Sequence, residues 1–406
     1  MRRSLTRCLV PLAAVALIAA GCSDDDDDGA EGTEPTSGAT ADSVATGGTA
    51  GTTTGDTAGT TTGDTSGATT TPDTGDEVQT GESTLDAVIA ADVVRCGVRD
   101  DLAGFNFVDE QGEQVGFDAD FCRVIAAAVL GDATKVDFVP VETDARFTAL
   151  QSGEFDVLVR NTTWTADRDG SEGATFLHPI YYDGQSMMVS ADAGFASIDD
   201  MDGTVICVAG GTTSEGNVAA EFARRGLTLE VQSFDDIDLL QEAYIAGRCD
   251  GWSSDLSQLK SRRSSYPADA GGPESLVIFE DDVFSKEPLA PAVVDGDSRW
   301  AQAVEWAIFA TIQAEEFGIT SENVEGFDAG DDVNLQRFLG LEIEGDDGAA
   351  PLDPGLDLPA DFAVQVVSQV GNYGEIFERN LGPLELPRGL NALWTDGGLQ
   401  YAPPYR

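Results

Sequence analysis

The sequence has little positive charge, few aromatic residues and almost no histidine. Its 406 residues contain 22 Lys+Arg against 73 Asp+Glu, which gives a net charge of −51, and His178 is the one histidine. A surface this acidic repels phosphate backbones, which argues against a nucleic-acid partner. A single histidine argues against a His-centred catalytic triad or a multi-His metal site. We therefore expect no metal and no cofactor.

The first 22 residues have the pattern of an export signal. Arg2, Arg3 and Arg7 precede an apolar stretch at residues 8–20, which is too short to span a bilayer stably. Residues 18–22 (IAAGC) resemble a bacterial lipobox, which predicts that Cys22 becomes the lipidated first residue. The protein would then be exported and anchored to the outer face of the cytoplasmic membrane. An ordinary secretory signal with an incidental cysteine is the alternative.

Residues 23–83 cannot build a hydrophobic core. The segment consists mainly of Thr, Gly, Ala and Asp and contains no Lys or Arg. Such a composition predicts a disordered linker, because burial cannot offset the chain entropy. A flexible chain of about 60 residues has a root-mean-square reach of about 40–45 Å. We interpret the linker as a tether through the cell envelope that threonine glycosylation could modify.

Four further cysteines lie in the exported part of the chain, where disulfides persist. They are Cys96, Cys122, Cys207 and Cys249, and they allow three pairings. We expect Cys96–Cys122 and Cys207–Cys249, which keep each bridge within one half of the chain. Four free buried cysteines are the alternative.

Strand-like and helix-like segments alternate between residues 90 and 300. Residues 136–141 and 156–159 are strand-like, the intervening 146–153 is amphipathic, and Gly131, Gly153, Gly226 and Gly247 follow helix-like runs. This alternation predicts α/β domains with largely parallel sheets. The loop Gly210, Gly211, Thr212 and Thr213 lies between a strand and a helix, so its amides could hold an anion. It lacks the lysine of a nucleotide phosphate site.

Several ordered segments carry a family resemblance. They include residues 95–98 (RCGV), 116–123 (GFDADFCR), 160–165 (RNTTWT), 285–289 (SKEPL), 370–380 (VGNYGEIFERN) and 388–394 (RGLNALW). Together they resemble the type 2 periplasmic solute-binding proteins of amino-acid ABC transporters, and within them the general L-amino-acid-binding subfamily. The resemblance implies a monomeric, two-lobed α/β protein that delivers free L-amino acids to a membrane permease. Lobe 1 would comprise residues 84–186 and 288–406, lobe 2 would comprise 187–287, and hinge crossings would lie near 187–189 and 287–290.

The resemblance also implies the ligand contacts. Arg168 would hold the ligand α-carboxylate, Asp255 its ammonium group, and Asn161 and Thr163 both groups. The amide and hydroxyl of Thr213 would donate to the carboxylate, within the loop that includes Gly211 and Thr212. From spacing alone, Arg168 could instead pair with Asp167 or Asp169, and Asp255 could be a helix N-cap.

Three other residues are candidates for the pocket wall. Leu102 stands where many relatives have an aromatic ring, which suggests a broad ligand range. Arg99 would lie at the cleft mouth, where it either attracts acidic side chains or is solvated. Trp164 either lines the pocket or packs under the hinge.

Two functions of other classes remain open at this stage. Some exported relatives of this fold resemble dehydratases, but no residue of this sequence is placed as an acid or base by its pattern. A sensor domain would usually be joined to a membrane-spanning signalling segment, which this sequence lacks.

Overall fold

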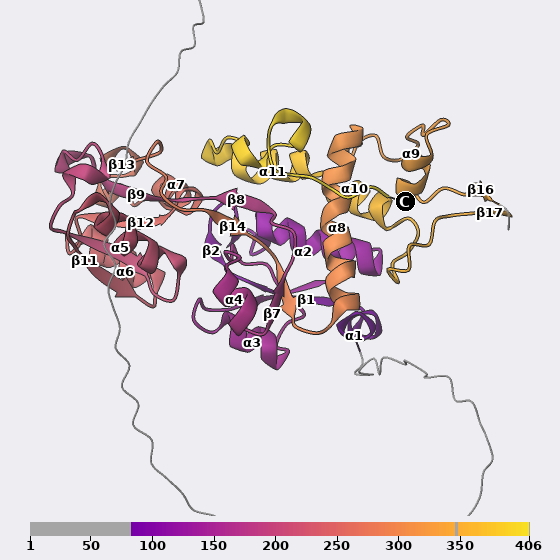
Figure 1. Ribbon diagram of the computed structural model, residues 1–406, viewed down its shortest axis with the longest axis horizontal. Helices are drawn as coiled ribbons and strands as arrows, with labels where there is room; N and C mark the ends of the chain where they lie inside the picture. Colours follow the sequence, from indigo (N-terminus) through magenta and orange to yellow (C-terminus); the bar gives the residue numbers. More distant parts are fainter. Residues whose placement is uncertain (1–82, 346–347, 406) are drawn as a thin grey trace, which may run out of the picture. The chain divides into compact units, whose positions relative to one another are not determined.

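The computed structural model describes residues 83–345 and 348–405 (Figure 1). The predicted signal, Cys22 and the linker up to residue 82 lie outside the described residues. Within the described part, no helix is both long and apolar enough to cross a membrane. The description opens with α1 (Thr84–Ala91), whose N-cap Ser83 accepts a hydrogen bond from the amide of Leu85.

The first lobe is built on a five-stranded sheet in the order β5-β1-β6-β15-β7. Its strands are β1 (Val94–Val98), β5 (Val136–Pro140), β6 (Val157–Leu158), β7 (Ala174–Phe176) and β15 (Ala292–Val294). Strand β1 runs parallel to β5 and β6, whereas β15 runs antiparallel to β6 and β7. The first lobe also contains a small sheet of β2 (Asp101–Leu102), β3 (Asn106–Val108) and β4 (Gln114–Val115), and the helices α2 (Phe117–Leu130), α3 (Arg146–Ser152), α4 (Ala166–Ser171) and α8 (Ser298–Phe317).

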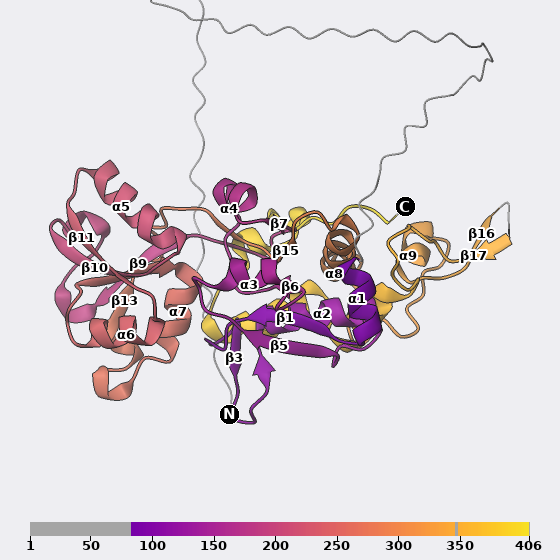
Figure 2. The same ribbon diagram turned by 90° about the horizontal axis from the view of Figure 1, so that it is seen from below.

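The second lobe has a sheet of its own in the order β11-β10-β12-β9-β13. Its strands are β9 (Gln185–Ser190), β10 (Thr204–Ala209), β11 (Leu229–Phe234), β12 (Gly251–Asp255) and β13 (Leu276–Ile278). Strand β10 runs parallel to β11 and β12, and β9 runs antiparallel to β12 and β13. The helices α5 (Thr213–Arg225), α6 (Ile237–Ile245) and α7 (Leu256–Ser264) surround this sheet, as Figure 2 shows from a second direction. The prediction of a two-lobed α/β fold is confirmed.

Two paired strands connect the lobes. The chain leaves the first lobe through β8 (Tyr181–Asp183) and returns through β14 (Glu287–Leu289), and the two strands run antiparallel. We expected the first crossing near residues 187–189, but these residues are fully buried within strand β9 of the second lobe. The crossing therefore lies a few residues earlier, where β8 ends.

Four helices end just before the glycines that the sequence indicated as helix stops. Gly131, Gly153 and Gly226 are the C-caps of α2, α3 and α5, and each has a positive φ. A glycine adopts this left-handed conformation without the steric cost that a Cβ atom imposes. Gly247 comes directly after the cap of α6 and also has a positive φ.

The C-terminal extension completes the first lobe. It contains α9 (Val333–Phe338), the hairpin of β16 (Ile343–Gly345) and β17 (Gly348–Ala350), α10 (Phe362–Gln369) and α11 (Tyr373–Leu381). The rings of Tyr373 and Phe377 pack edge to face on Phe117 of α2, and the hydroxyl of Tyr373 donates to the carbonyl of Ile180 at 2.8 Å. The extension thus shares a hydrophobic core with α2 and with the chain that leads into β8.

Both expected disulfides are present. Cys96 of β1 is bonded to Cys122 of α2, and Cys207 of β10 is bonded to Cys249, which precedes β12. Each bridge ties a central strand to a neighbouring element of its own lobe, as the division of the sequence into two halves predicted.

Candidate functional site

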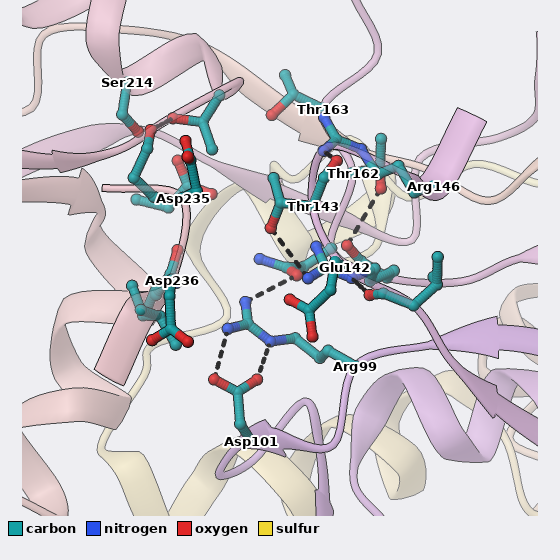
Figure 3. A pocket seen from close by; sticks show the side chains of 18 of the residues that line it. Arg99, Asp101, Glu142, Thr143, Arg146, Thr162, Thr163, Ser214, Asp235 and Asp236 are labelled. Atoms are coloured by element: carbon teal, nitrogen blue, oxygen red, sulfur yellow. Dashed lines mark hydrogen bonds and ion pairs between the residues drawn. The ribbon is translucent and has the colours of Figure 1, made fainter. Parts of the chain in front are cut away.

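A cavity of about 210 Å³ has walls from both lobes. The first lobe contributes the ends of β1 and β5 and the loops that precede α3 and α4, and the second contributes the start of α5, the loop before α6 and the end of β12 (Figure 3). Its polar lining includes Arg99, Asp101, Thr143, Arg146, Arg160, Asn161, Thr163, Arg168, Thr212, Thr213, Ser214 and Asp255.

Arg168 enters this cavity from α4. The hydroxyl of the N-cap residue Thr165 accepts a hydrogen bond from the amide of Arg168, which fixes the first turn of the helix. The guanidinium group is buried and donates from Nη1 to the carbonyl of Thr163 at 2.9 Å. Within residues 83–345 and 348–405 it forms no ion pair, so the alternative pairing with Asp167 or Asp169 is not observed. Its remaining N–H groups are free to bind an anion.

Asp255 is the last residue of β12 and lines the same cavity. It occupies the N-cap position of α7, but its side chain makes no capping hydrogen bond. Burial raises the pKa of this carboxyl well above its ordinary value, and nearby Asp183 and Glu287 raise it further, against the opposing effect of Arg168. A cation placed beside this group would restore its negative charge.

Glu287 and Asp183 extend this acidic cluster, and the sequence analysis missed both. They stand directly opposite each other in the β8–β14 ladder, where like charges are unfavourable. Glu287 accepts hydrogen bonds from Thr213 Oγ1 at 2.9 Å and from Asn217 Nδ2 at 2.7 Å. Burial raises the pKa of Asp183 to about 6. The pairing of the two crossing strands, which is visible only in the fold, brings these carboxyls together.

The loop before α5 presents backbone amides to the cavity. Thr212 is the N-cap of α5 but makes no side-chain capping bond, because its hydroxyl donates to the carbonyl of Ala209 at 2.6 Å. The first amides of the helix therefore lack an intrahelical or capping partner and can receive an anion. The hydroxyl of Thr213, expected to donate to a ligand, donates to Glu287 in this structure.

Asn161 and Thr163 lie where β6 leads into α4. Asn161 has φ of +36°, a region that non-glycine residues seldom adopt, and its side chain accepts from Arg99 Nη1 at 3.2 Å. The backbone N–H of Asn161 donates a hydrogen bond to the carboxylate of the buried Asp118 at 3.0 Å. Thr163 forms an isolated bridge with Leu289 beside the return crossing. These contacts hold both residues at the cavity wall.

Three predicted pocket residues do not line the cavity. Leu102 is fully buried in the hydrophobic core, because successive strand residues face opposite sides and its neighbour Asp101 takes the cavity side. Trp164 is 38% exposed and stacks parallel on Phe176. Gly211 contributes only a carbonyl that accepts from Arg146 at 3.4 Å.

Three further arginines reach the cavity, and of these only Arg99 was expected from the sequence. Arg99 is buried, not solvated, and its guanidinium holds both carboxylate oxygens of Asp101 at 2.7 and 3.1 Å (Figure 3). Arg160 donates to the carbonyl of Val141 at 2.8 Å and to Thr143 Oγ1 at 3.0 Å. Arg146, at the start of α3, lines the cavity beside them.

Two α/β lobes joined by two crossing strands, with a polar cavity between them that offers both cationic and anionic groups, define a solute-binding protein. In the described part of the chain, no group of three or more His, Cys, Asp or Glu side chains is arranged to hold a metal ion. The chain belongs to the bacterial extracellular solute-binding proteins, family 3, which match residues 94–329.

Similar proteins come from several bacteria. The general L-amino acid-binding periplasmic protein AapJ of Rhizobium johnstonii is 46% identical over 80% of this chain and 93% of its own length. The glutamate/glutamine/aspartate/asparagine-binding protein BztA of Rhodobacter capsulatus is 43% identical over 80% of this chain and 94% of its own. The structure of a periplasmic binding protein from Brucella ovis with glutathione bound has a TM-score of 0.74 and 43% identity, and covers 80% of this chain and 100% of that one.

Proposed function

We propose that this protein captures free L-amino acids of several kinds in the cavity between its lobes and delivers them to the permease of an ABC importer. The observation that carries the proposal is one cavity lined by Arg168, whose guanidinium forms no ion pair with the described residues, and by Asp255, whose carboxyl belongs to a cluster with Asp183 and Glu287. An amino acid is a zwitterion, and this arrangement complements both of its charges.

Each end of the ligand has its own partners. Arg168 and the first amides of α5 would bind the α-carboxylate, since charge-assisted hydrogen bonds contribute about 1.5–3 kcal/mol each. Asp255 would bind the ammonium group, with Asn161 and Thr163 completing the contacts. A ligand without an amine would leave the acidic cluster unneutralised, which rejects it.

The relatives support a role in transport. AapJ and BztA are named for amino-acid binding, and the Brucella ovis protein holds glutathione, whose γ-glutamyl group has an α-amino and an α-carboxylate group. In this account the protein acts as a monomer without catalysis, and a lipid on Cys22 keeps it at the outer face of the cytoplasmic membrane. A Cys22→Ser variant should then leave the membrane fraction, and retention there would contradict anchoring.

A thermal-shift screen tests the function directly. The full-length protein is heated with each of the twenty L-amino acids, with 2-keto acids and sugars as controls. A ligand at 100 times its dissociation constant adds about 2.7 kcal/mol to the free energy of unfolding, a clear rise in Tm. We expect shifts with several amino acids and none with the keto acids. No shift with any amino acid would contradict the proposal.

A further inference from the structure

The cavity contains more buried positive charge than one α-carboxylate requires. Arg146, Arg160 and Arg168 are each at most 9% exposed, and none has a carboxylate oxygen within 4.0 Å in the described part of the chain. A buried guanidinium without an anion is costly, because burial removes its hydration and nothing replaces it. The ligand is therefore the natural source of the missing negative charge.

The three arginines differ in how far the protein satisfies them. Arg160 donates hydrogen bonds of normal length from Nε and Nη2, so two of its donor groups are already satisfied within the first lobe. In the proposed function, Arg168 binds the α-carboxylate of the ligand. Arg146 is 4% exposed, and its Nη1 donates to the carbonyl of Thr143. Its Nε has no hydrogen-bond partner among the described residues, and its Nη2 makes only a long contact of 3.4 Å with the carbonyl of Gly211 in the other lobe.

The charges around Arg146 are themselves mostly positive. Burial, together with the neighbouring guanidinium groups of Arg168 and Arg160, lowers its pKa to about 9. The guanidinium carbons of Arg146 and Arg168 lie 4.8 and 5.9 Å from the centre of the same ring, that of Phe147, so the two cations flank one aromatic side chain. The opposing acids, Glu172 and Asp144, act on Arg146 more weakly.

The acidic residues that line the cavity do not supply the negative charge that Arg146 lacks. Glu142, Asp235, Asp236 and Asp238 line it but are solvent-exposed, and Asp236 accepts the amides of its own helix α6. Asp235 and Asp236 lie across the cavity from Arg146 in the view of Figure 3. Solvent and salt screen exposed charges strongly, whereas a buried guanidinium keeps most of its field.

We propose, on the basis of the proposed function, that the preferred ligands carry a second carboxylate and that Arg146 binds it. Arg168 and α5 hold the α-carboxylate, and Arg146 holds the carboxylate at the far end of the ligand. A free acidic amino acid and a short γ-glutamyl peptide share this chemistry. Neutral amino acids fit the same head-group site but leave Arg146 without an anion.

Calorimetry with matched ligand pairs tests this inference on the full-length wild-type protein. L-glutamate and L-glutamine have nearly the same shape and differ in the charge of the terminal group, as do L-aspartate and L-asparagine. We expect each acid to bind at least about tenfold more tightly than its amide, since a charge-assisted hydrogen bond is lost with the amide. Glutathione against L-glutamate then separates a peptide ligand from a free amino acid.

The Arg146→Met variant assigns the effect to the residue. It should abolish the preference for the acids, so that the ratio of the affinities for L-glutamate and L-glutamine falls from at least about tenfold to near one. Equal losses for both members of a pair would overturn the inference, because Arg146 would then serve the α-carboxylate or the fold. Equal affinity of the wild-type protein for acid and amide would also overturn it, without any variant. No binding of any amino acid would instead refute the proposed function.

Discussion

The arrangement of charge around single residues determines what the cavity can hold. Among the described residues, Arg168 forms no ion pair, and the carboxyl cluster of Asp255, Asp183 and Glu287 forms no salt bridge either. Arg168 and Asp255 line the cavity, as the family resemblance implied, although local spacing alone left an ion pair and a helix N-cap open for them. Asp183 and Glu287 could not be predicted, because the pairing of β8 with β14 joins residues that are more than 100 positions apart, and Arg146 could not, because only the fold places it at the cavity.

The acidic cluster predicts that ligand affinity depends on pH. Burial raises the pKa of Asp183 to about 6 and that of Asp255 above its ordinary value, so the empty site takes up protons as the pH falls toward that range. The ammonium group of the ligand binds only the ionised form of these carboxyls. The affinity for an amino acid should therefore be highest at pH 8 and fall below pH 6 by up to about tenfold per pH unit.

Calorimetry between pH 8 and pH 5 measures this dependence. Near pH 6, buffers of different ionisation enthalpy should reveal proton release on binding, and an Asp255→Asn variant should bind weakly at every pH. A constant affinity over this range would contradict the role of the cluster.

At the scale of elements, the fold was more predictable than the wall of the cavity. Alternating apolar runs and terminal glycines predicted strands such as β5 and helices such as α3, because hydrophobic periodicity and the φ preference of glycine are local properties of the sequence. Leu102 does not line the cavity in this structure, because a two-residue strand, β2, turns Asp101 rather than Leu102 toward it. One position of register decides which side chain meets the cavity, and sequence pattern alone does not set it.

The second disulfide should stabilise its lobe without touching the ligand. Cys207 and Cys249 are 42 residues apart and join β10 to the chain entering β12, and neither lines the cavity. Replacing both with alanine should lower the free energy of unfolding by about 4 kcal/mol on the loop-entropy model. Ligand affinity at 25 °C should change less than about threefold. Denaturant unfolding with unchanged stability, or free thiols in the wild-type protein, would contradict the bridge.

In the described molecule as a whole, α7 of the second lobe contacts the first lobe beside the cavity. Arg262 forms an ion pair with Asp101 of the first lobe, and Ser261 Oγ donates to the carbonyl of Ala103 at 2.8 Å. Arg99 and Arg262 together lower the pKa of Asp101 well below its usual range, although burial alone would raise it. Asp101 lines the cavity and also forms an ion pair with the other lobe, so a ligand in the cavity would lie beside a residue that holds the lobes together.

An Arg262→Ala variant should weaken this contact. Without ligand, the closed arrangement of the lobes should be less populated in this variant. The ligand affinity should therefore fall several-fold, because only the closed arrangement makes all the ligand contacts. Hydrogen exchange should become faster at α7 in the unliganded protein and slow again with ligand. Arg263→Ala, at the next position on the helix, is the matched control. Identical exchange in both variants would show that the pair does not hold the lobes.

The central claim is that Arg168 binds the α-carboxylate of an amino acid, and one calorimetric comparison tests it most directly. Wild-type protein, Arg168→Ala and the exposed control Arg248→Ala are titrated with the L-amino acid that gives the largest thermal shift. The account predicts that Arg168→Ala loses at least about 100-fold in affinity, for two charge-assisted hydrogen bonds, while Arg248→Ala binds as the wild type does. An Arg168→Ala variant that is folded and binds with wild-type affinity would contradict the account.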